Sequence, residues 1–133
     1  MVFDAWAILA WLSGEPGGEY VQRFFEETKK GKMRIFMSFI NMGEVFYILA
    51  KRAGFKEALE VKGLLLKSPV KFILPSERQI WKAAEIKARY PVSYADAFAI
   101  ALSLIKEAPL VTGDPEIKRL ENKESLSLIW IRK

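Results

Sequence analysis

Short runs rich in apolar residues alternate along this 133-residue chain with longer segments whose apolar positions recur every three or four residues. The short runs are typical of buried strands, whereas the longer segments are typical of amphipathic helices. Strands are predicted at residues 1–3, 34–37, 70–74, 110–112 and 127–131. Helices are predicted at residues 5–12, 19–30, 39–54, 55–67, 77–89, 92–105 and 115–121.

Strands that alternate with helices predict a mainly parallel sheet with helices on both faces. The expected fold class is α/β, as a three-layer α/β/α sandwich with a central sheet of four to five strands. No repeat, low-complexity tract or long linker interrupts residues 1–133, so we expect a single domain. In such sheets, ligands bind beyond the carboxyl ends of the strands, near the point where the strand order reverses.

One predicted helix, residues 92–105, carries a single charged residue, Asp96. A helix of this composition is buried, and an acid beside a core must be a helix cap, a paired charge or a ligand. Only three of the sixteen acidic residues are aspartates, and the other two, Asp4 and Asp114, each follow a predicted strand. Glu44 is the only acid of its predicted helix and has uncharged neighbours one turn away. We therefore expect these four acids to converge on one site.

The chain contains neither cysteine nor histidine. This excludes disulfides, thiol and imidazole catalysis, Ser-His-Asp triads and the usual zinc ligands. Clustered carboxylates raise one another's pKa unless a cation compensates, and Mg²⁺ or Mn²⁺ suits a site made of oxygen ligands. Such an ion activates water for attack on a phosphodiester, and the four acids could hold one ion or two. Thr112 and Ser93 could orient water or phosphate by hydrogen bonding.

A purely structural reading exists for each acid. Asp4 and Asp114 could each cap the helix that follows, and Asp96 could complete a cap that begins at Ser93. Glu44 could form an ion pair with a basic residue such as Arg34 or Lys51. Taken together, these readings do not explain why every aspartate lies at the predicted end of the sheet.

The charge of the chain suggests a polyanionic partner. Net charge is +5, and it becomes +9 when the four candidate acids are set aside, leaving 21 basic and 12 acidic residues. A basic body around an acidic centre suits a substrate such as RNA. Residues 1–15 lack a basic leader, and the apolar stretch 5–12 is too short to cross a membrane. We therefore expect a cytoplasmic protein.

Apolar residues make up 51% of the chain, more than a small monomer needs for its core. Either burial in the core or exposure in a groove or dimer face would account for the aromatic residues of the helices. These residues are Trp6, Trp11, Phe24, Phe25, Phe46, Phe55 and Trp81. The helical spacing predicts an inward face at Leu59, Leu65 and Leu66 of one helix, and it centres another helix on Ile80, Trp81, Ala84 and Ala88.

Four segments resemble the PIN-domain family, and within it the small VapC-type toxins of toxin–antitoxin pairs. They are VFDAWAIL around Asp4, INMGEVFYIL around Glu44, SYADAFAIALSL around Asp96 and LVTGDPEIKRL around Asp114. Their order and spacing cover nearly the whole chain, and the last two are the more specific. The resemblance implies a ribonuclease that cuts RNA with water activated by Mg²⁺ or Mn²⁺. It also implies a homodimer and a small antitoxin protein that silences the enzyme.

By position, the four acids match the family's acidic quartet, so the resemblance implies that they are both catalytic residues and metal ligands. It also implies auxiliary roles for Thr112 and Glu116, and Ser93 stays an auxiliary candidate through its hydroxyl alone. Ala5 and Trp6 depart from the family, in which Ser or Thr often follows the first aspartate. This departure removes a possible contact that orients a metal ligand. Two alternatives remain: a catalytically weak RNA-binding or protein-interaction module with the PIN fold, and an RNA-processing PIN nuclease that is not a toxin.

Overall fold

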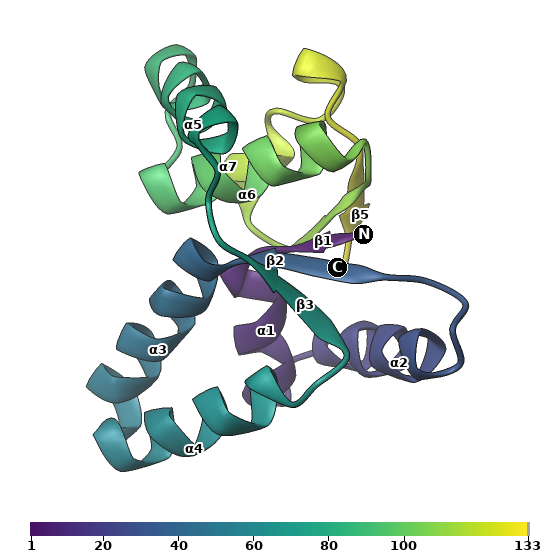
Figure 1. Ribbon diagram of the computed structural model, residues 1–133, viewed down its shortest axis with the longest axis vertical. Helices are drawn as coiled ribbons and strands as arrows, with labels where there is room; N and C mark the ends of the chain where they lie inside the picture. The colour runs from purple at the N-terminus through teal and green to yellow at the C-terminus, as the bar shows by residue number, and fades with distance from the viewer. Residues whose placement is uncertain (133) are drawn as a thin grey trace.

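The centre of the molecule is a sheet of five strands, all parallel, in the order β3-β2-β1-β4-β5 (Figure 1). A computed structural model of the chain describes residues 1–132. The strands are β1 (Val2–Phe3), β2 (Ile35–Ser38), β3 (Val70–Ile73), β4 (Leu110–Thr112) and β5 (Leu128–Trp130). The predicted strands are confirmed, and the sheet is wholly rather than mainly parallel.

Helices connect the strands and cover both faces of the sheet, which confirms the predicted three-layer α/β/α sandwich. Figure 1 shows α5, α6 and α7 on one face, and α1 to α4 on the other. The helices are α1 (Ala5–Leu12), α2 (Gly18–Lys29), α3 (Phe39–Ala53), α4 (Phe55–Leu66), α5 (Glu77–Arg89), α6 (Tyr94–Lys106) and α7 (Pro115–Lys118), with a short 3₁₀ turn at Lys123–Ser125. Among residues 1–132, every helix is too short or too polar to cross a membrane.

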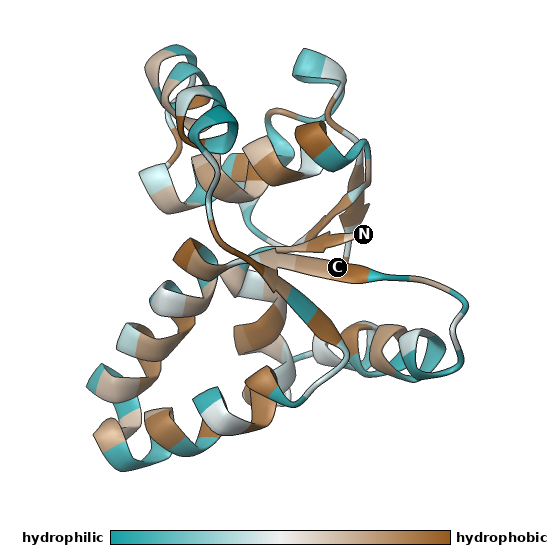
Figure 2. Ribbon diagram, in the orientation of Figure 1, coloured by the Kyte–Doolittle hydropathy of each residue, from teal (hydrophilic) through white to brown (hydrophobic). Residues whose placement is uncertain are grey.

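Successive residues of the central strands build two separate cores. Val2 and Leu110 are fully buried in the core shared with α5 and α6, whereas Phe3 and Val111 are fully buried in the core shared with α1, α2 and α3. Side chains of a strand alternate between the two faces of a sheet, and here both faces are covered. This is why the strands read as short runs rich in apolar residues, and Figure 2 shows the arrows mainly in brown or tan, with a teal stretch in β3, which contains Lys71.

Helix α6 is the most deeply buried helix of the described chain. Every residue from Asp96 to Ser103 is buried, because α6 packs between the sheet and α5. Ser93 caps the helix by accepting a hydrogen bond from the backbone N–H of Asp96 at 3.0 Å. The prediction of a buried helix that begins beside Asp96 is therefore confirmed.

The order of the strands brings two predicted site residues to one edge of the sheet. From β1 the chain continues to β2 and β3 on one side, whereas β4 and β5 lie on the other side, so the order reverses between β1 and β4. Because these neighbouring strands are parallel, their carboxyl ends meet at the same edge. Asp4 directly follows β1 and Asp114 lies two residues after β4. In open α/β sheets this is the usual position of a ligand site.

The predicted inward face of α4 is only partly correct. Leu65 is buried as expected, whereas Leu59 and Leu66 are exposed. Helix α4 packs mainly against α3 and only its end approaches β3, so most of its circumference faces solvent (Figure 1). The sequence pattern indicates an apolar face but not whether a neighbour covers it.

In α5, the apolar residues around which the helix was predicted do not form its buried face. The buried positions are Gln79, Ala83 and Ile86, whereas Ile80 is exposed and Trp81 has an exposed fraction of 64%. Two of these three buried side chains are polar or small because α5 lies close against α6, where Nε2 of Gln79 donates a hydrogen bond to the carbonyl of Phe98 at 3.2 Å.

The aromatic residues of the helices divide between core and surface. Phe25 is buried, and Trp6, Trp11, Phe24 and Phe46 are half-buried. Phe55 is 71% exposed on α4, and Trp81 is exposed on α5. Only part of the predicted aromatic surface is therefore open to a partner.

Candidate metal centre

Asp4 is held at the carboxyl end of β1 by hydrogen bonds to both of its carboxylate oxygens. Its Oδ1 accepts a hydrogen bond from the backbone N–H of Ala7 at 2.9 Å, which caps α1. Its Oδ2 accepts a short hydrogen bond from the hydroxyl of Thr112, the last residue of β4. Asp4 is only 1% exposed. The structural reading of Asp4 as a cap is thus correct, but the cap uses only one of its oxygens.

Thr112 also fixes the backbone that leads to Asp114. The backbone N–H of Asp114 donates to the hydroxyl oxygen of Thr112 at 3.0 Å. Oδ1 of Asp114 in turn accepts from the N–H of Glu116 at 2.9 Å and caps α7. One hydroxyl therefore connects the acid after β1 with the acid after β4. Sequence reasoning gave Thr112 and Ser93 a role in orienting water or phosphate, whereas here both hydroxyls bond to the segments that carry the acids.

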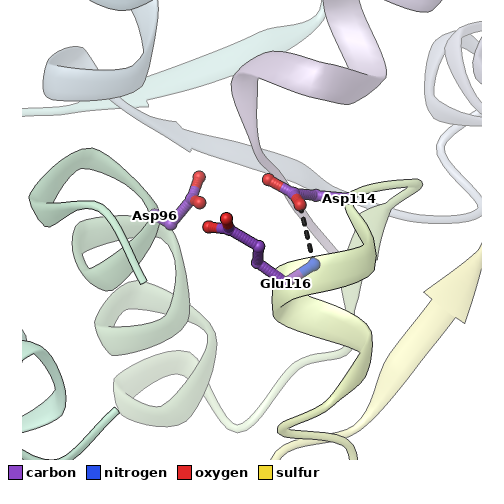
Figure 3. A group of neighbouring side chains, drawn as sticks. All are labelled: Asp96, Asp114 and Glu116. Carbon is purple, nitrogen blue, oxygen red and sulfur yellow. Dashed lines mark hydrogen bonds between the residues drawn. The ribbon is translucent and has the colours of Figure 1, made fainter. Parts of the chain in front are cut away.

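Asp96 faces Asp114 and Glu116 across the gap between α6 and α7 (Figure 3). Each of these three residues offers a carboxylate oxygen, and the three oxygens all lie within 4.8 Å of one another. Asp96 is 8% exposed, Asp114 is half-buried and Glu116 is exposed. The group therefore lies at the surface, at the carboxyl-terminal edge of the sheet, and not in the core. Glu116, expected only as an auxiliary residue, belongs to the tightest group of acids.

Glu44 and Asn41 lie one turn apart on α3. Within residues 1–132, Glu44 Oε1 is buried without a hydrogen-bond partner, and so is Asn41 Oδ1. The side-chain amide of Asn41 donates to the carbonyl of Ala95 at 2.9 Å, which ties α3 to the first turn of α6 beside Asp96. No Lys or Arg nitrogen of the described chain lies within 4.0 Å of Glu44, so the predicted alternative of an ion pair is wrong.

The PIN domain profile matches residues 1–123 of the chain. This chain belongs to the PIN domain family. Comparison with curated protein sequences finds no significant match.

Solved structures of low sequence identity share the fold of this PIN domain. DNA-bound VapBC from Salmonella typhimurium is 16% identical, with a TM-score of 0.73, over 96% of this chain and 95% of that chain. VapBC2 from Rickettsia felis, bound to a DNA fragment from its promoter, is 19% identical, with a TM-score of 0.71, over 97% and 98%. VapC20 from Mycobacterium tuberculosis, a toxin that cleaves the sarcin-ricin loop, is 20% identical, with a TM-score of 0.69, over 90% and 94%.

The electrostatics of this PIN domain show that the four predicted acids lie within reach of one another. Burial raises the pKa of Asp96 to about 8, and the charges of Asp114, Asp4 and Glu44 add to the rise. Burial also raises the pKa of Asp4 to about 7, although the hydrogen bonds from Thr112 and Ala7 oppose it. Burial also raises the pKa of Glu44, and the charge of Asp114 adds to the rise, although the nearby side-chain amide of Asn41 opposes it.

This donor set fits a hard divalent cation. All the donors are carboxylate oxygens, which Mg²⁺ and Mn²⁺ prefer. A cation would favour the ionised forms that burial and mutual repulsion now disfavour, and it would give the orphaned Glu44 Oε1 a partner. The structure brings the four predicted acids to one edge of the sheet, while their role as catalytic residues and metal ligands stays a prediction.

Sequence reasoning missed the contribution of Asn41. Its fully buried side chain connects the helix that carries Glu44 with the helix that carries Asp96. The available signal was an amide one turn before the only acid of a largely apolar helix. The sequence could not show that this amide would meet the carbonyl of Ala95, which lies 54 positions further along the chain.

Proposed function

We propose that this protein is a metal-dependent endoribonuclease that hydrolyses RNA phosphodiester bonds, and that it is the toxin of a toxin–antitoxin pair. The observation that supports this proposal best is the convergence of four acids from four different elements at the strand-order reversal, with a buried Glu44 oxygen left without a partner in residues 1–132. Membership of the PIN domain family over residues 1–123 supports the nuclease chemistry. We also propose that residues 1–133 form one domain that acts in the cytoplasm.

Each acid has a role in this proposal. Asp96, Asp114 and Glu116 would hold one Mg²⁺ or Mn²⁺ ion, because their oxygens already lie within 4.8 Å of one another. Asp4, which follows β1, and Glu44, which lies on α3, would complete the metal site. A bound ion supplies an activated water and neutralises the charge that develops on the phosphodiester.

The uncharged residues would keep the acids in position. Thr112 holds the Asp4 carboxylate through Oδ2, so that Asp4 does not rotate away from the centre. Asn41 holds α3 against the start of α6, which fixes the separation of Glu44 from Asp96. Positioning contacts of this kind orient ligands and strengthen metal affinity.

The substrate and partners follow from charge and from exposed apolar surface. The net charge of +9 outside the four acids favours a polyanion such as RNA, and VapC20, one of the structural relatives, is a toxin that cleaves the sarcin-ricin loop. Phe55 and Leu64 of α4 are exposed, which provides apolar surface for an antitoxin protein. The relatives from Salmonella typhimurium and Rickettsia felis are VapBC complexes, and we propose a homodimer with a bound antitoxin here as well.

A second function has one observation in its favour. Asp4 and Asp114 both cap helices, as a purely structural role requires. A catalytically weak module that binds RNA or protein would keep these caps and the basic surface. It would bind RNA in a salt-sensitive way without any metal.

Titration of Mn²⁺ into the purified full chain, with cleavage of a structured RNA followed in parallel, tests the proposal. In Asp96→Asn, we expect Mn²⁺ affinity and cleavage to fall together, each by at least about 100-fold, because one ligand charge is lost. Glu57→Gln, at an exposed position of α4, removes one negative charge far from the centre and should match the wild type. Full metal-dependent cleavage by Asp96→Asn, or RNA binding without any Mn²⁺ binding by the wild type, would overturn the nuclease proposal.

A further inference from the structure

A small cavity opens beside the candidate metal centre. Its volume is about 270 Å³, and Trp6, Glu15, Pro16, Gly17 and Arg132 line it. Trp6 lies two residues after Asp4 in the first turn of α1, and its ring lies against Gly113, the residue that precedes Asp114. The cavity therefore shares an edge of the sheet with the acids.

The backbone around the cavity holds the Trp6 ring in place. A Cβ atom on Gly113 would clash with Cζ3 and Cη2 of the indole, so only glycine permits this approach. A Cβ atom on Gly17 would lie 3.2 Å from Cζ3 of the same ring. The indole is thus fixed from two sides and remains half-buried at the cavity wall.

Arg132 adds a second planar group to the wall. Its guanidinium carbon lies 5.9 Å from the centroid of the Trp6 ring. Its Nη1 donates to the carbonyl of Gly113 at 3.3 Å, which holds the side chain near the segment that leads to Asp114. An aromatic ring and an Arg plane are the two surfaces on which unpaired nucleic-acid bases stack.

The polar lining favours a base over a phosphate. Glu15 contributes a carboxylate, which repels phosphate but accepts hydrogen bonds from the amino groups of adenine, cytosine and guanine. Uracil has no such amino group. The volume lies just below the range of about 300 to 1,000 Å³ that holds complete small-molecule ligands, so it suits one part of a longer ligand.

We propose that Trp6, Arg132 and Glu15 form a subsite for one nucleobase of the RNA strand, and that it prefers bases with an exocyclic amino group to uracil. The base would stack against the wall that Trp6 and Arg132 form together, not between them, because the guanidinium carbon lies only 5.9 Å from the ring centroid, and its amino group would donate to Glu15. The subsite rests on the proposed ribonuclease function, because it places a base next to the phosphodiester that the acids would attack.

Binding of short fluorescent RNA homopolymers of A, C and U to the full chain, in EDTA and at constant salt, tests the subsite. The wild type should bind the A and C oligomers more tightly than the U oligomer, and Glu15→Gln should lose most of this preference. Arg132→Ala should weaken binding of all three by about 5- to 50-fold, as expected for loss of a stacked base. Arg52→Ala and Glu57→Gln, at exposed positions of α3 and α4, make the same changes in net charge as Arg132→Ala and Glu15→Gln, respectively, and each should shift affinity by less than about 2-fold. Trp6→Leu should resemble Arg132→Ala, with a melting curve to verify its fold.

Cleavage with Mn²⁺ separates failure of the subsite from failure of the nuclease proposal. If the wild type shows the base preference but never cleaves RNA, the subsite stands and the nuclease proposal fails. If it cleaves RNA while Glu15→Gln keeps the full base preference, or while Arg132→Ala binds as tightly as Arg52→Ala, the subsite is wrong. If the wild type binds no RNA in EDTA but cleaves RNA with Mn²⁺, the subsite alone is wrong. If it neither binds RNA in EDTA nor cleaves it with Mn²⁺, both proposals are wrong.

Discussion

At the scale of single residues, Thr112 connects the two strands that end at the centre. Its hydroxyl donates to Asp4 Oδ2 and accepts from the N–H of Asp114, so both hydrogen-bonding directions of one side chain are used. The sequence indicated the residue but not this geometry, because the partner acid lies 108 positions away. Counting aspartates was sufficient to find three of the four acids, and Glu44 stood out as the only acid of its helix, whereas the bonds that orient these residues depend on the three-dimensional fold.

Thr112→Val removes this hydroxyl at nearly constant volume. We expect a fall in Mn²⁺ affinity of about 10- to 100-fold, because the Asp4 carboxylate loses the bond that orients it. The free energy of unfolding should fall by about 1 to 3 kcal/mol, because Asp4 Oδ2 is then buried without that donor. Calorimetric titration and urea denaturation measure the two effects.

Thr28→Val is the matched control for this substitution. The hydroxyl of Thr28 donates to the carbonyl of Phe24 on α2, away from the acids. It should leave Mn²⁺ affinity unchanged while costing a little stability. Equal Mn²⁺ affinity in Thr112→Val and Thr28→Val would show that the Thr112 hydroxyl does not orient the centre.

At the scale of elements, the existence of each helix and strand was predictable and the coverage of its faces was not. Parallel strands buried on both faces read as continuous apolar runs, and Ser38, Ser76 and Ser93 begin helices by accepting backbone hydrogen bonds, so local signals agree with the fold. The faces of α4 and α5 depend on which neighbours pack against them. The sequence therefore left Trp81 open between core and surface, whereas the buried α6 was predicted correctly.

The contact between α1 and the segment after β4 gives a prediction at this scale. Gly113→Ala places a methyl group against the Trp6 ring, so either the helix or the loop must shift. We expect a loss of about 1 to 3 kcal/mol in the free energy of unfolding, in the range of overpacked cores. Urea denaturation of Gly113→Ala, Trp6→Ala and the double variant measures the coupling.

The double variant decides whether the clash is the cause. With Trp6 reduced to Ala, the added methyl group at Gly113 should cost less than it does in the wild type, so the two effects should be less than additive. Gly43→Ala serves as a control, because a Cβ atom on Gly43 meets no atom within 4 Å and alanine favours a helix. Fully additive losses at Gly113 and Trp6 would contradict the proposed contact.

At the scale of the whole molecule, the acids couple metal binding to stability and pH. The pKa of Asp4 is about 7 and that of Asp96 about 8 in the folded chain, against about 4 for an unfolded aspartate. Below about pH 4 both carboxyl groups are protonated in the folded and in the unfolded state. The stabilisation of the folded state that comes from their raised pKa values is therefore fully present there. As the pH rises from 4 toward 8, the unfolded state releases its protons first, so the folded state loses relative stability.

The metal-free protein should therefore melt at a lower temperature at pH 8 than at pH 5.5, by roughly 5 °C or more. Mn²⁺ should reverse the loss at pH 8 and have little effect at pH 5.5, because it binds the ionised carboxylates. Glu124, whose pKa is lowered by Arg89, stays ionised across this range and does not contribute to the slope. Thermal melts in EDTA and in Mn²⁺ measure both effects.

Asp96→Asn is the variant that separates this mechanism from the titration of the remaining surface. It removes the acid with the higher of the two pKa values and lowers the repulsion on Asp4, so the melting temperature of the metal-free variant should vary less between pH 5.5 and 8. At pH 8 the variant should exceed the metal-free wild type in melting temperature, because it no longer carries a buried charge without a counterion. An equal pH slope in the two proteins would mean that the buried acids are not what limits stability at neutral pH, and that a cation is not needed to hold them together.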